Sequence, residues 1–252
     1  MLTLAGKVVE IRHDPATNRR IMSLSTNPQL PLPLRAGKAF LHKGASPLPK
    51  GFQHYLTYSD QLSELPDGAS CTVLGPEFAY LDDGDVIALG NGRLRSIFRA
   101  GSDHNSLLLT EQCNNYCLMC SQPPKRVDDR WLLDEAMEAV RLMPRETESL
   151  GITGGEPTLF GDGFIDLLRH IKNWLPRASL HVLSNGRGFA DEAFTRAYAA
   201  VGHPDLMVGI PVYSDDPARH DYVVQARGAF DETIRGVLNL KRYKQKVEIR
   251  VV

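Results

Sequence analysis

The chain has 252 residues, which is long enough for one large domain or two modest ones. Its composition, 42% hydrophobic and 23% charged, is typical of a globular protein, and its formal net charge of -1 disfavours nucleic acid as a partner. No stretch approaches the roughly 20 apolar residues of a membrane span, and the N-terminal MLTLAGKVVEIRHDP lacks the apolar run of a signal peptide, so we expect a cytoplasmic protein without a membrane partner.

Residues 1–104 consist of short apolar runs interrupted by Gly, Pro, Asp and Asn. This pattern predicts a small β-rich domain. Three of these runs read GKVVEI, GKAFLH and ASCTVLG. Two strand-like runs, 85–89 and 93–98, flank Asn91-Gly92. Because Asn-Gly tolerates the positive backbone angles of a type I′ turn, this segment predicts a β-hairpin.

Residues 105–252 alternate apolar strands with segments of helical period, which indicates an α/β domain of parallel strands joined by right-handed crossovers. We expect strands at 106–110, 148–153, 179–184, 206–213 and 247–252, and helices at 132–143, 164–175, 191–200 and 230–243. The last strand ends the chain, where such a unit normally continues into a helix. We therefore expect the natural protein to extend beyond Val252.

Two of the predicted helices have an apolar face that can be named in advance. In the first helix the stripe is Leu133, Met137 and Val140. In the second helix it is Phe164, Leu167, Leu168, Ile171, Trp174 and Leu175.

The loop after the first predicted parallel strand, TEQCNNYCLMCSQPP at 110–124, carries three of the four cysteines: Cys113, Cys117 and Cys120. In parallel β/α folds the chemistry lies on loops at the carboxyl ends of strands, and thiolates spaced C-x-x-x-C-x-x-C can converge on one inorganic centre. Most such centres take four protein ligands, but Cys71 lies in a strand-like run elsewhere. Three ligands would leave one metal position open; the alternative is a zinc site completed by His104 or by a partner.

The cysteine motif, together with TGGEP at 153–157 after the second strand, resembles the radical S-adenosylmethionine (SAM) superfamily. SNG at 184–186 and GIPVYSDDPARHDYV at 209–223 follow the third and fourth strands in a similar way. The resemblance implies a partial (β/α) radical SAM barrel of about five strands, in which the three cysteines bind a [4Fe-4S] cluster. SAM would chelate the fourth iron, and an electron from an external donor would cleave it to a 5′-deoxyadenosyl radical.

The resemblance also implies cofactor contacts. Gly154 and Gly155 would let the backbone approach the methionine moiety of SAM, and Glu156 would accept its ammonium group. A turn with a solvated carboxylate is the plainer interpretation of the same residues. Ser184 and Asn185 fit a cofactor contact and a simple turn equally well. Met119 stands where the family usually has an aromatic residue whose backbone meets the adenine.

Pro211 departs from the resemblance, because related chains often carry a serine here, directed at the carboxylate or ribose of the cofactor. Arg250, in the last strand, is flanked by apolar residues. A buried arginine needs an anion, so we expect Arg250 to face the cofactor carboxylate in place of the missing hydroxyl. The alternative is an arginine on the outer face of the strand.

The longer string LLLTEQCNNYCLMCSQPPK, preceded by a β-rich domain, most resembles the radical SAM maturases of the His-Xaa-Ser peptide system. That resemblance implies a small peptide substrate and a second radical SAM maturase as a partner. Two alternatives stay open, namely a radical SAM enzyme that modifies RNA or a nucleotide, and a non-catalytic iron-sulfur binding module. No residue is singled out as the catalytic acid or base.

Overall fold

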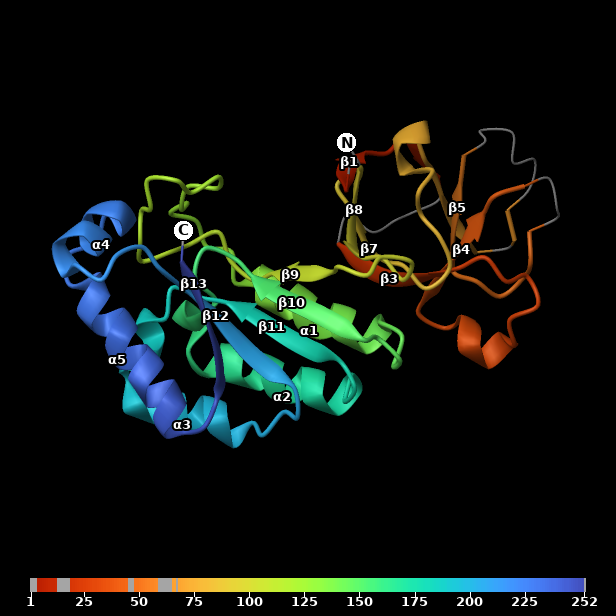
Figure 1. Cartoon of the computed structure of the whole chain (residues 1–252). Coiled ribbons are helices and arrows are strands. Elements are labelled where there is room, and N and C mark those ends of the chain that lie inside the picture. Colours follow the sequence, from red (N-terminus) through yellow and green to blue (C-terminus); the bar gives the residue numbers. More distant parts are fainter. Residues whose placement is uncertain (1–3, 13–18, 45–47, 59–64, 67, 252) are drawn as a thin grey trace. The chain divides into compact units, whose positions relative to one another are not determined.

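The computed structural model describes residues 4–12, 19–44, 48–58, 65–66 and 68–251 (Figure 1). The chain divides into two compact units. Unit 1 comprises Met1–Asp103 with Arg141–Pro144, and unit 2 comprises His104–Val140 with Arg145–Val252. Val252, predicted to end the last strand, lies outside the described residues. No helix in the described ranges is both long and apolar enough to cross a bilayer.

Unit 1 is built on one eight-stranded mixed sheet with the order β1-β8-β7-β3-β4-β5-β6-β2. Its strands are β1 (Ala5–Lys7), β2 (Glu10–Arg12), β3 (Arg20–Ser25), β4 (Lys38–His42), β5 (His54–Thr57), β6 (Ser70–Val73), β7 (Val86–Gly90) and β8 (Arg93–Phe98). The neighbours β3 to β6 run parallel, whereas β7 and β8 pair antiparallel. Two 3₁₀ helices, η1 (Leu32–Arg35) and η2 (Pro76–Phe78), complete its regular structure.

The two ends of this sheet are joined by its first segment. Strand β1 pairs with β8, and β2, which follows directly, pairs with β6. Between them, Val8 N donates to Gly92 O (3.0 Å) and Val9 N donates to Val73 O (2.9 Å). One bent strand therefore hydrogen-bonds to both ends of the sheet.

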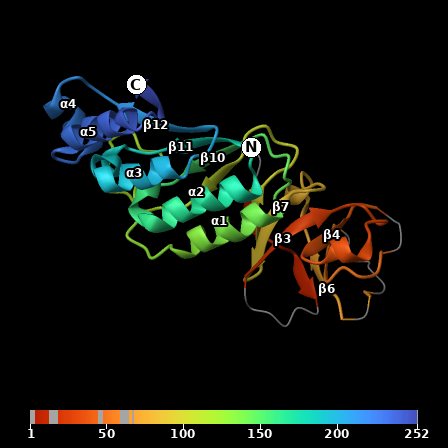
Figure 2. The same ribbon diagram turned by 90° about the horizontal axis from the view of Figure 1, so that it is seen from below.

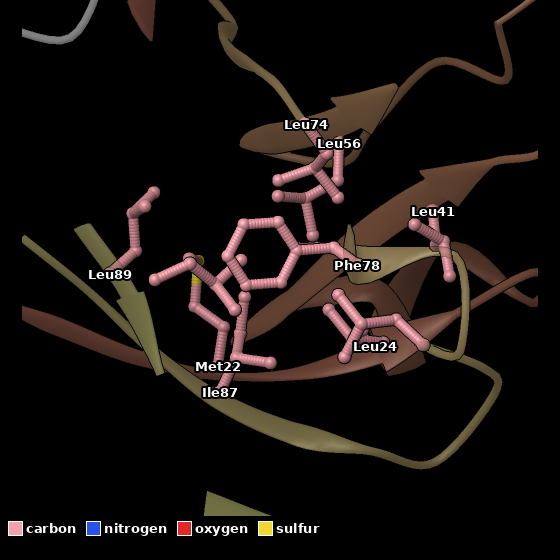
Figure 3. Packing of buried hydrophobic residues seen from close by; sticks show 11 residues of the cluster. Met22, Leu24, Leu41, Leu56, Leu74, Phe78, Ile87 and Leu89 are labelled. Atoms are coloured by element: carbon pink, nitrogen blue, oxygen red, sulfur yellow. The ribbon is translucent and has the colours of Figure 1, made fainter. Parts of the chain in front are cut away.

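The predicted hairpin is confirmed, because β7 and β8 are antiparallel and both turn residues have positive φ, 51° at Asn91 and 68° at Gly92. The run GKVVEI lies in this bent strand, which is divided at Val8-Val9 into β1 and β2. The core of unit 1 surrounds Phe78, which is fully buried (Figure 3). Figure 3 shows its ring among Met22, Leu24, Leu41, Leu56, Leu74, Ile87 and Leu89.

Unit 2 is the predicted α/β fold, a five-stranded sheet with the order β13-β12-β11-β10-β9 in which every neighbouring pair is parallel. Its strands are β9 (Ser106–Leu108), β10 (Ser149–Thr153), β11 (Ser179–Leu183), β12 (Leu206–Val212) and β13 (Lys246–Val251). Its helices are α1 (Trp131–Leu142), α2 (Asp162–Trp174), α3 (Glu192–Ala200), α4 (Pro217–Val224) and α5 (Ala229–Arg242), with 3₁₀ turns η3 (Pro157–Phe160) and η4 (Arg187–Ala190). Figures 1 and 2 show α1, α2 and α3 along one face of the sheet.

The predicted apolar faces of the helices are partly wrong. In α1, Leu133 and Met137 are half-buried, and the buried face is instead Leu132, Ala136, Ala139 and Val140. This face lies one position away because alanines, not large apolar residues, pack against the sheet. In α2 the prediction holds except at Trp174, the last residue of the helix, which is 38% exposed.

Candidate cofactor site

The carboxyl ends of the strands in unit 2 surround a cavity of about 880 Å³, a volume typical of small-molecule sites. The cysteine loop and the segments that end β10, β11, β12 and β13 all contribute to its wall. The predicted site residues that line it are Cys113, Cys117, Cys120, Gly154, Gly155, Ser184, Asn185 and Arg250. Glu156 and Met119 are not among the lining residues.

The cysteine loop is held at its start by Asp129, a buried carboxylate just before α1. Thr110 Oγ1 lies 3.0 Å from each carboxylate oxygen, Glu111 N donates at 2.5 Å, and Gln112 Nε2 donates at 3.1 Å. A carboxylate that accepts this many hydrogen bonds holds its donors firmly in place. Asp129 therefore fixes residues 110–112, the approach to Cys113, and the sequence analysis did not identify it.

Further along, the cysteine loop is hydrogen-bonded to the end of α4. Tyr116 N donates to Val224 O (2.9 Å) and Leu118 N donates to Val223 O (3.0 Å). The helix itself was not predicted; its first turn is capped by Asp216, which accepts hydrogen bonds from the backbone N–H groups of the first turn. The backbone of the loop is thus positioned by the protein's own hydrogen bonds.

The three thiols differ in burial, since Cys113 and Cys117 are partly buried and Cys120 is exposed. Burial raises the pKa of Cys113, and the nearby Glu156 carboxylate and Cys117 raise it further. Burial also raises the pKa of Cys117, as does the neighbouring Cys120. A bound metal reverses this balance, because thiolates are its ligands and binding releases their protons.

The three thiols are brought to one site, because Cys113, Cys117 and Cys120 all line the same cavity. Cysteine thiolates are the usual ligands of iron-sulfur clusters. The donor set therefore fits three-cysteine ligation of a [4Fe-4S] cluster.

Neither of the other candidate ligands belongs to this site. His104 precedes β9, at the end of the sheet opposite to the cavity, so a zinc site completed by His104 is not supported. Cys71 is fully buried in β6 of unit 1, where burial raises its pKa to about 11. Such a thiol is a core residue and not a metal ligand.

The double glycine after β10 is required by a close approach between two loops. Gly155 N donates to Thr110 O (2.7 Å) and Glu156 N donates to Gln112 O (2.8 Å). A Cβ atom on Gly155 would lie 2.0 Å from Gln112 O, and one on Gly154 would lie 2.8 Å from Thr110 O. The glycines let the segment after β10 cross the start of the cysteine loop; their predicted contact with the cofactor stays a prediction.

Glu156 lies behind the cavity wall, because its carboxylate is fully buried and does not line the cavity. One oxygen accepts from Thr158 N (3.0 Å), Thr158 Oγ1 (2.7 Å) and Ser184 Oγ (2.8 Å), and the other accepts from Asn185 N (2.7 Å). Burial raises the pKa of Glu156, and these hydrogen bonds oppose that rise. The carboxylate joins the ends of β10 and β11, and its predicted contact with the SAM ammonium stays a prediction.

Ser184 and Asn185 line the cavity, yet their polar groups are largely engaged within the protein. The Ser184 hydroxyl donates to Glu156 and accepts from Gly186 N (3.0 Å). Asn185 Nδ2 donates to Asn114 Oδ1 (2.7 Å) and lies 3.8 Å from Cys113 Sγ. The contacts present here are those of a turn that supports the cysteine loop, and direct binding of the cofactor stays a prediction.

Met119, whose backbone was predicted to meet adenine, does not line the cavity, and that contact stays a prediction. Cys120 N donates to Cys117 O (3.1 Å), which closes a tight turn. Leu118 and Met119 form the outer corner of that turn and are 59% and 49% exposed. The geometry of the C-x-x-C turn therefore directs Met119 outward.

Arg250 lies on the cavity wall, beside its register partner Pro211 in β12. Its side chain is half-exposed, and its Nε lies 3.5 Å from a Glu248 oxygen that is also 3.1 Å from His181 Nε2. The position is the one that a substitute for the hydroxyl missing at Pro211 requires. Its role toward a cofactor carboxylate stays a prediction.

One further lining residue, Tyr213, was not predicted. Tyr213, just after β12, lines the cavity, and burial, with smaller contributions from Cys117 and Cys120, raises its pKa. His220 is buried beneath it and accepts from Tyr213 N (3.3 Å) through Nδ1. Asp221 accepts from Phe230 N (2.8 Å), so the His220-Asp221 pair orders the turn between α4 and α5.

Arg187, the first residue of η4, also escaped the sequence analysis. Its side chain is 14% exposed, and its Nη1 donates to Asn114 O (2.6 Å) and to Asn115 Oδ1 (2.7 Å). Its Nε donates to Glu232 Oε2 (2.6 Å) on α5. Arg187 thus connects the part of the cysteine loop between Cys113 and Cys117 to helix α5.

The fold and the site together define a β/α half-barrel protein with three cysteines lining a cavity at the carboxyl ends of its strands. The family model described as the Radical SAM superfamily matches residues 107–252, more than half of the chain. The chain belongs to the radical SAM superfamily, which uses a [4Fe-4S] cluster and SAM as cofactors.

The individual proteins that match the chain share less than a third of its residues in the matched region. Two curated relatives from Haemophilus influenzae, strains 86-028NP and PittGG, are both named GTP 3′,8-cyclase and are 28% identical to the chain over 154 residues. The match covers 59% of this chain and 44% of each relative, so the chain spans less than half of their length.

Among solved structures, native anSMEcpe with bound AdoMet is 19% identical, with 57% of this chain and 42% of that chain covered and a TM-score of 0.46. Methylornithine synthase (PylB) is 14% identical, with coverages of 58% and 43% and a TM-score of 0.44.

Proposed function

We propose that this chain carries the core of a radical SAM enzyme that modifies a small peptide. The observation that carries the enzymatic part is the convergence of three thiols, the double-glycine turn and Arg250 on one cavity at the carboxyl ends of parallel strands. When bound, the cluster and SAM supply reductive cleavage of the sulfonium to a 5′-deoxyadenosyl radical, which removes a hydrogen atom from the substrate.

The residues of the chain would bind and orient these groups. Cys113, Cys117 and Cys120 would hold the cluster, and Asp129 would keep the loop that carries them in place. Arg250 would offer its guanidinium to the SAM carboxylate, since a planar fork of donors matches a carboxylate. Leu183 and the partly buried Pro211 and Tyr213 form an apolar part of the wall that would exclude water from the reacting atoms.

The charges around the cavity favour a peptide over a nucleoside triphosphate. Of the described lining residues, Lys125 and Arg250 are the cations, and both have acidic partners. Lys125 Nζ lies 2.5 Å from Glu111 Oε1, and Arg250 Nε lies 3.5 Å from Glu248. A triphosphate is bound through several cations, so this wall suits a substrate with little negative charge. The string LLLTEQCNNYCLMCSQPPK, with its resemblance to peptide maturases, supports the same choice.

A nucleotide substrate is the second candidate, because the curated relatives that match the chain are named GTP 3′,8-cyclase. A non-catalytic iron-sulfur module is the third, and a cavity beside the thiols argues for a catalyst instead. The proposed partners are a small peptide, an external electron donor and a second radical SAM maturase, in the cytoplasm.

The full-length protein, reconstituted with iron and sulfide without oxygen, tests the proposal in two steps. With SAM and dithionite it should form 5′-deoxyadenosine, and the Cys117→Ala variant should form none. Co-expression with neighbouring small open reading frames should then yield a peptide whose mass changes only with the intact enzyme. A cluster-loaded protein that forms no 5′-deoxyadenosine would show a binding module, and conversion of GTP in place of a peptide would identify a nucleotide enzyme.

A further inference from the structure

We propose that Arg187 and Glu232 are positioning residues that hold the cysteine loop from behind and tune the reduction potential of the cluster that it binds. The proposal rests on the cluster and is independent of the substrate. Neither residue lines the cavity, so neither is expected to touch SAM or the substrate.

The first step of the argument is geometric. Arg187 donates to the backbone carbonyl of Asn114 and to the side chain of Asn115, the two residues that follow Cys113. Asn115 N in turn lies 3.4 Å from Cys113 Sγ, and Asn185 Nδ2 bonds to Asn114 Oδ1. The guanidinium therefore contacts the segment whose N–H points at the first ligand sulfur.

The second step is that the anchor on the other side is rigid. Glu232 lies in the first turn of α5, where an acidic side chain also complements the helix dipole. The helix is fastened to the turn after β11 by Thr233 Oγ1, which donates to Asn185 O (3.0 Å). A Cβ atom at Gly236 would lie 2.2 Å from Gly186 O, so α5 packs directly on the backbone of that turn. Arg187 thus connects the loop to a fixed body.

The third step is electrostatic. The Arg187 side chain is mostly buried whereas that of Glu232 is 45% exposed, so the arginine charge is screened less by solvent. Local charge and hydrogen bonding near the sulfurs set the potential of an iron-sulfur cluster. A positive charge behind the loop favours the reduced cluster, which carries one more electron, and Glu232 partly cancels that charge. Removing the two charges one at a time should therefore shift the potential in opposite directions.

The test uses the cluster-loaded full-length protein and two isosteric changes. Glu232→Gln keeps an acceptor for Arg187 and should raise the midpoint potential in an EPR-monitored redox titration. Arg187→Gln should lower it and should also speed the loss of iron to a chelator several-fold, because the loop loses its tether. The matched controls are Glu192→Gln and Arg242→Gln. They neutralise an ion pair at the C-terminal end of α5, in which Arg242 Nη1 lies 3.2 Å from Glu192 Oε2. Neither control should change the midpoint potential or the rate of iron loss.

Opposite shifts of the midpoint potential support the proposal. A purely structural role would change the rate of iron loss to the chelator, but the direction of each potential shift would not follow the charge that was removed. Shifts of the same sign, or no shift with either variant, would overturn it. Should Arg187→Gln fail to fold, Glu232→Gln with an unchanged circular dichroism spectrum decides alone: a raised potential supports the proposal and an unchanged one overturns it.

Discussion

The two units bury polar side chains for different purposes. In unit 1, His54 is buried in β5, and its two ring nitrogens bond to Ser70 Oγ (2.6 Å) and Thr72 Oγ1 (3.0 Å) of the neighbouring strand β6. In unit 2, buried Asp129 and Glu156 bond to loops whose other side lines a cavity. Buried polarity alone therefore does not mark a site; its position at the carboxyl ends of parallel strands does.

The largest expected difference between the two units is in the effect of replacing their cysteines. Alanine in place of Cys113, Cys117 or Cys120 should abolish the cluster, whereas Cys71→Ala in unit 1 should leave about four irons per chain. Iron analysis and EPR of anaerobically reconstituted protein measure the difference. Zinc bound stoichiometrically in place of iron, or loss of the cluster in Cys71→Ala, would contradict the assignment.

Glu156 should show the second largest effect. Glu156→Ala leaves four buried donors without their acceptor, and we expect it to lower the free energy of unfolding by about 2–4 kcal/mol. Denaturant unfolding of the apoprotein measures this, and Glu156→Gln, which keeps one acceptor oxygen, should cost less. If Glu156→Ala kept its stability and lost only SAM affinity, the contact with the SAM ammonium would be supported.

His54 provides the counterpart in unit 1. His54→Ala removes one hydrogen-bond partner from Ser70 Oγ and one from Thr72 Oγ1 and opens a small cavity, so we expect a loss of about 1–3 kcal/mol in stability. The iron content and the cluster EPR signal of reconstituted protein should not change. A variant that folds normally but fails to load iron would mean that the network of unit 1 serves the site after all.

Arg250 should have the smallest effect, because its side chain is half-exposed and solvent screens its charge. Arg250→Leu should weaken SAM binding by roughly tenfold or less, which corresponds to about 1 kcal/mol. Adding Pro211→Ser to that variant supplies the hydroxyl that the chain lacks and should recover part of the affinity. Isothermal titration of the cluster-loaded protein measures both; unchanged affinity in Arg250→Leu would leave Pro211 without compensation.

The sequence predicted most of the α/β fold of unit 2, because each strand and helix carries its own periodicity and the cysteine motif follows a strand. It missed α4, although Asp216-Pro217 is a common helix start, since the run SDDPARHDYV was interpreted as a loop. Asp129, Arg187 and the burial of Glu156 could not be predicted in the same way. Apart from Thr158, which is two residues from Glu156, their partners lie 17 to 73 residues away in the sequence, and no local pattern shows which loops cross.

The bent strand at the start of unit 1 has a consequence for how that unit forms during synthesis. Its partners, Cys71 to Val73 in β6 and Arg93 to Arg95 in β8, are made long after residues 5–12 have left the ribosome. Pairing of such sequence-distant segments is slow, and unpaired strand edges favour contacts between chains. The backbone N–H and C=O groups of residues 5–7 therefore lack their native partners in the nascent chain until β8 emerges.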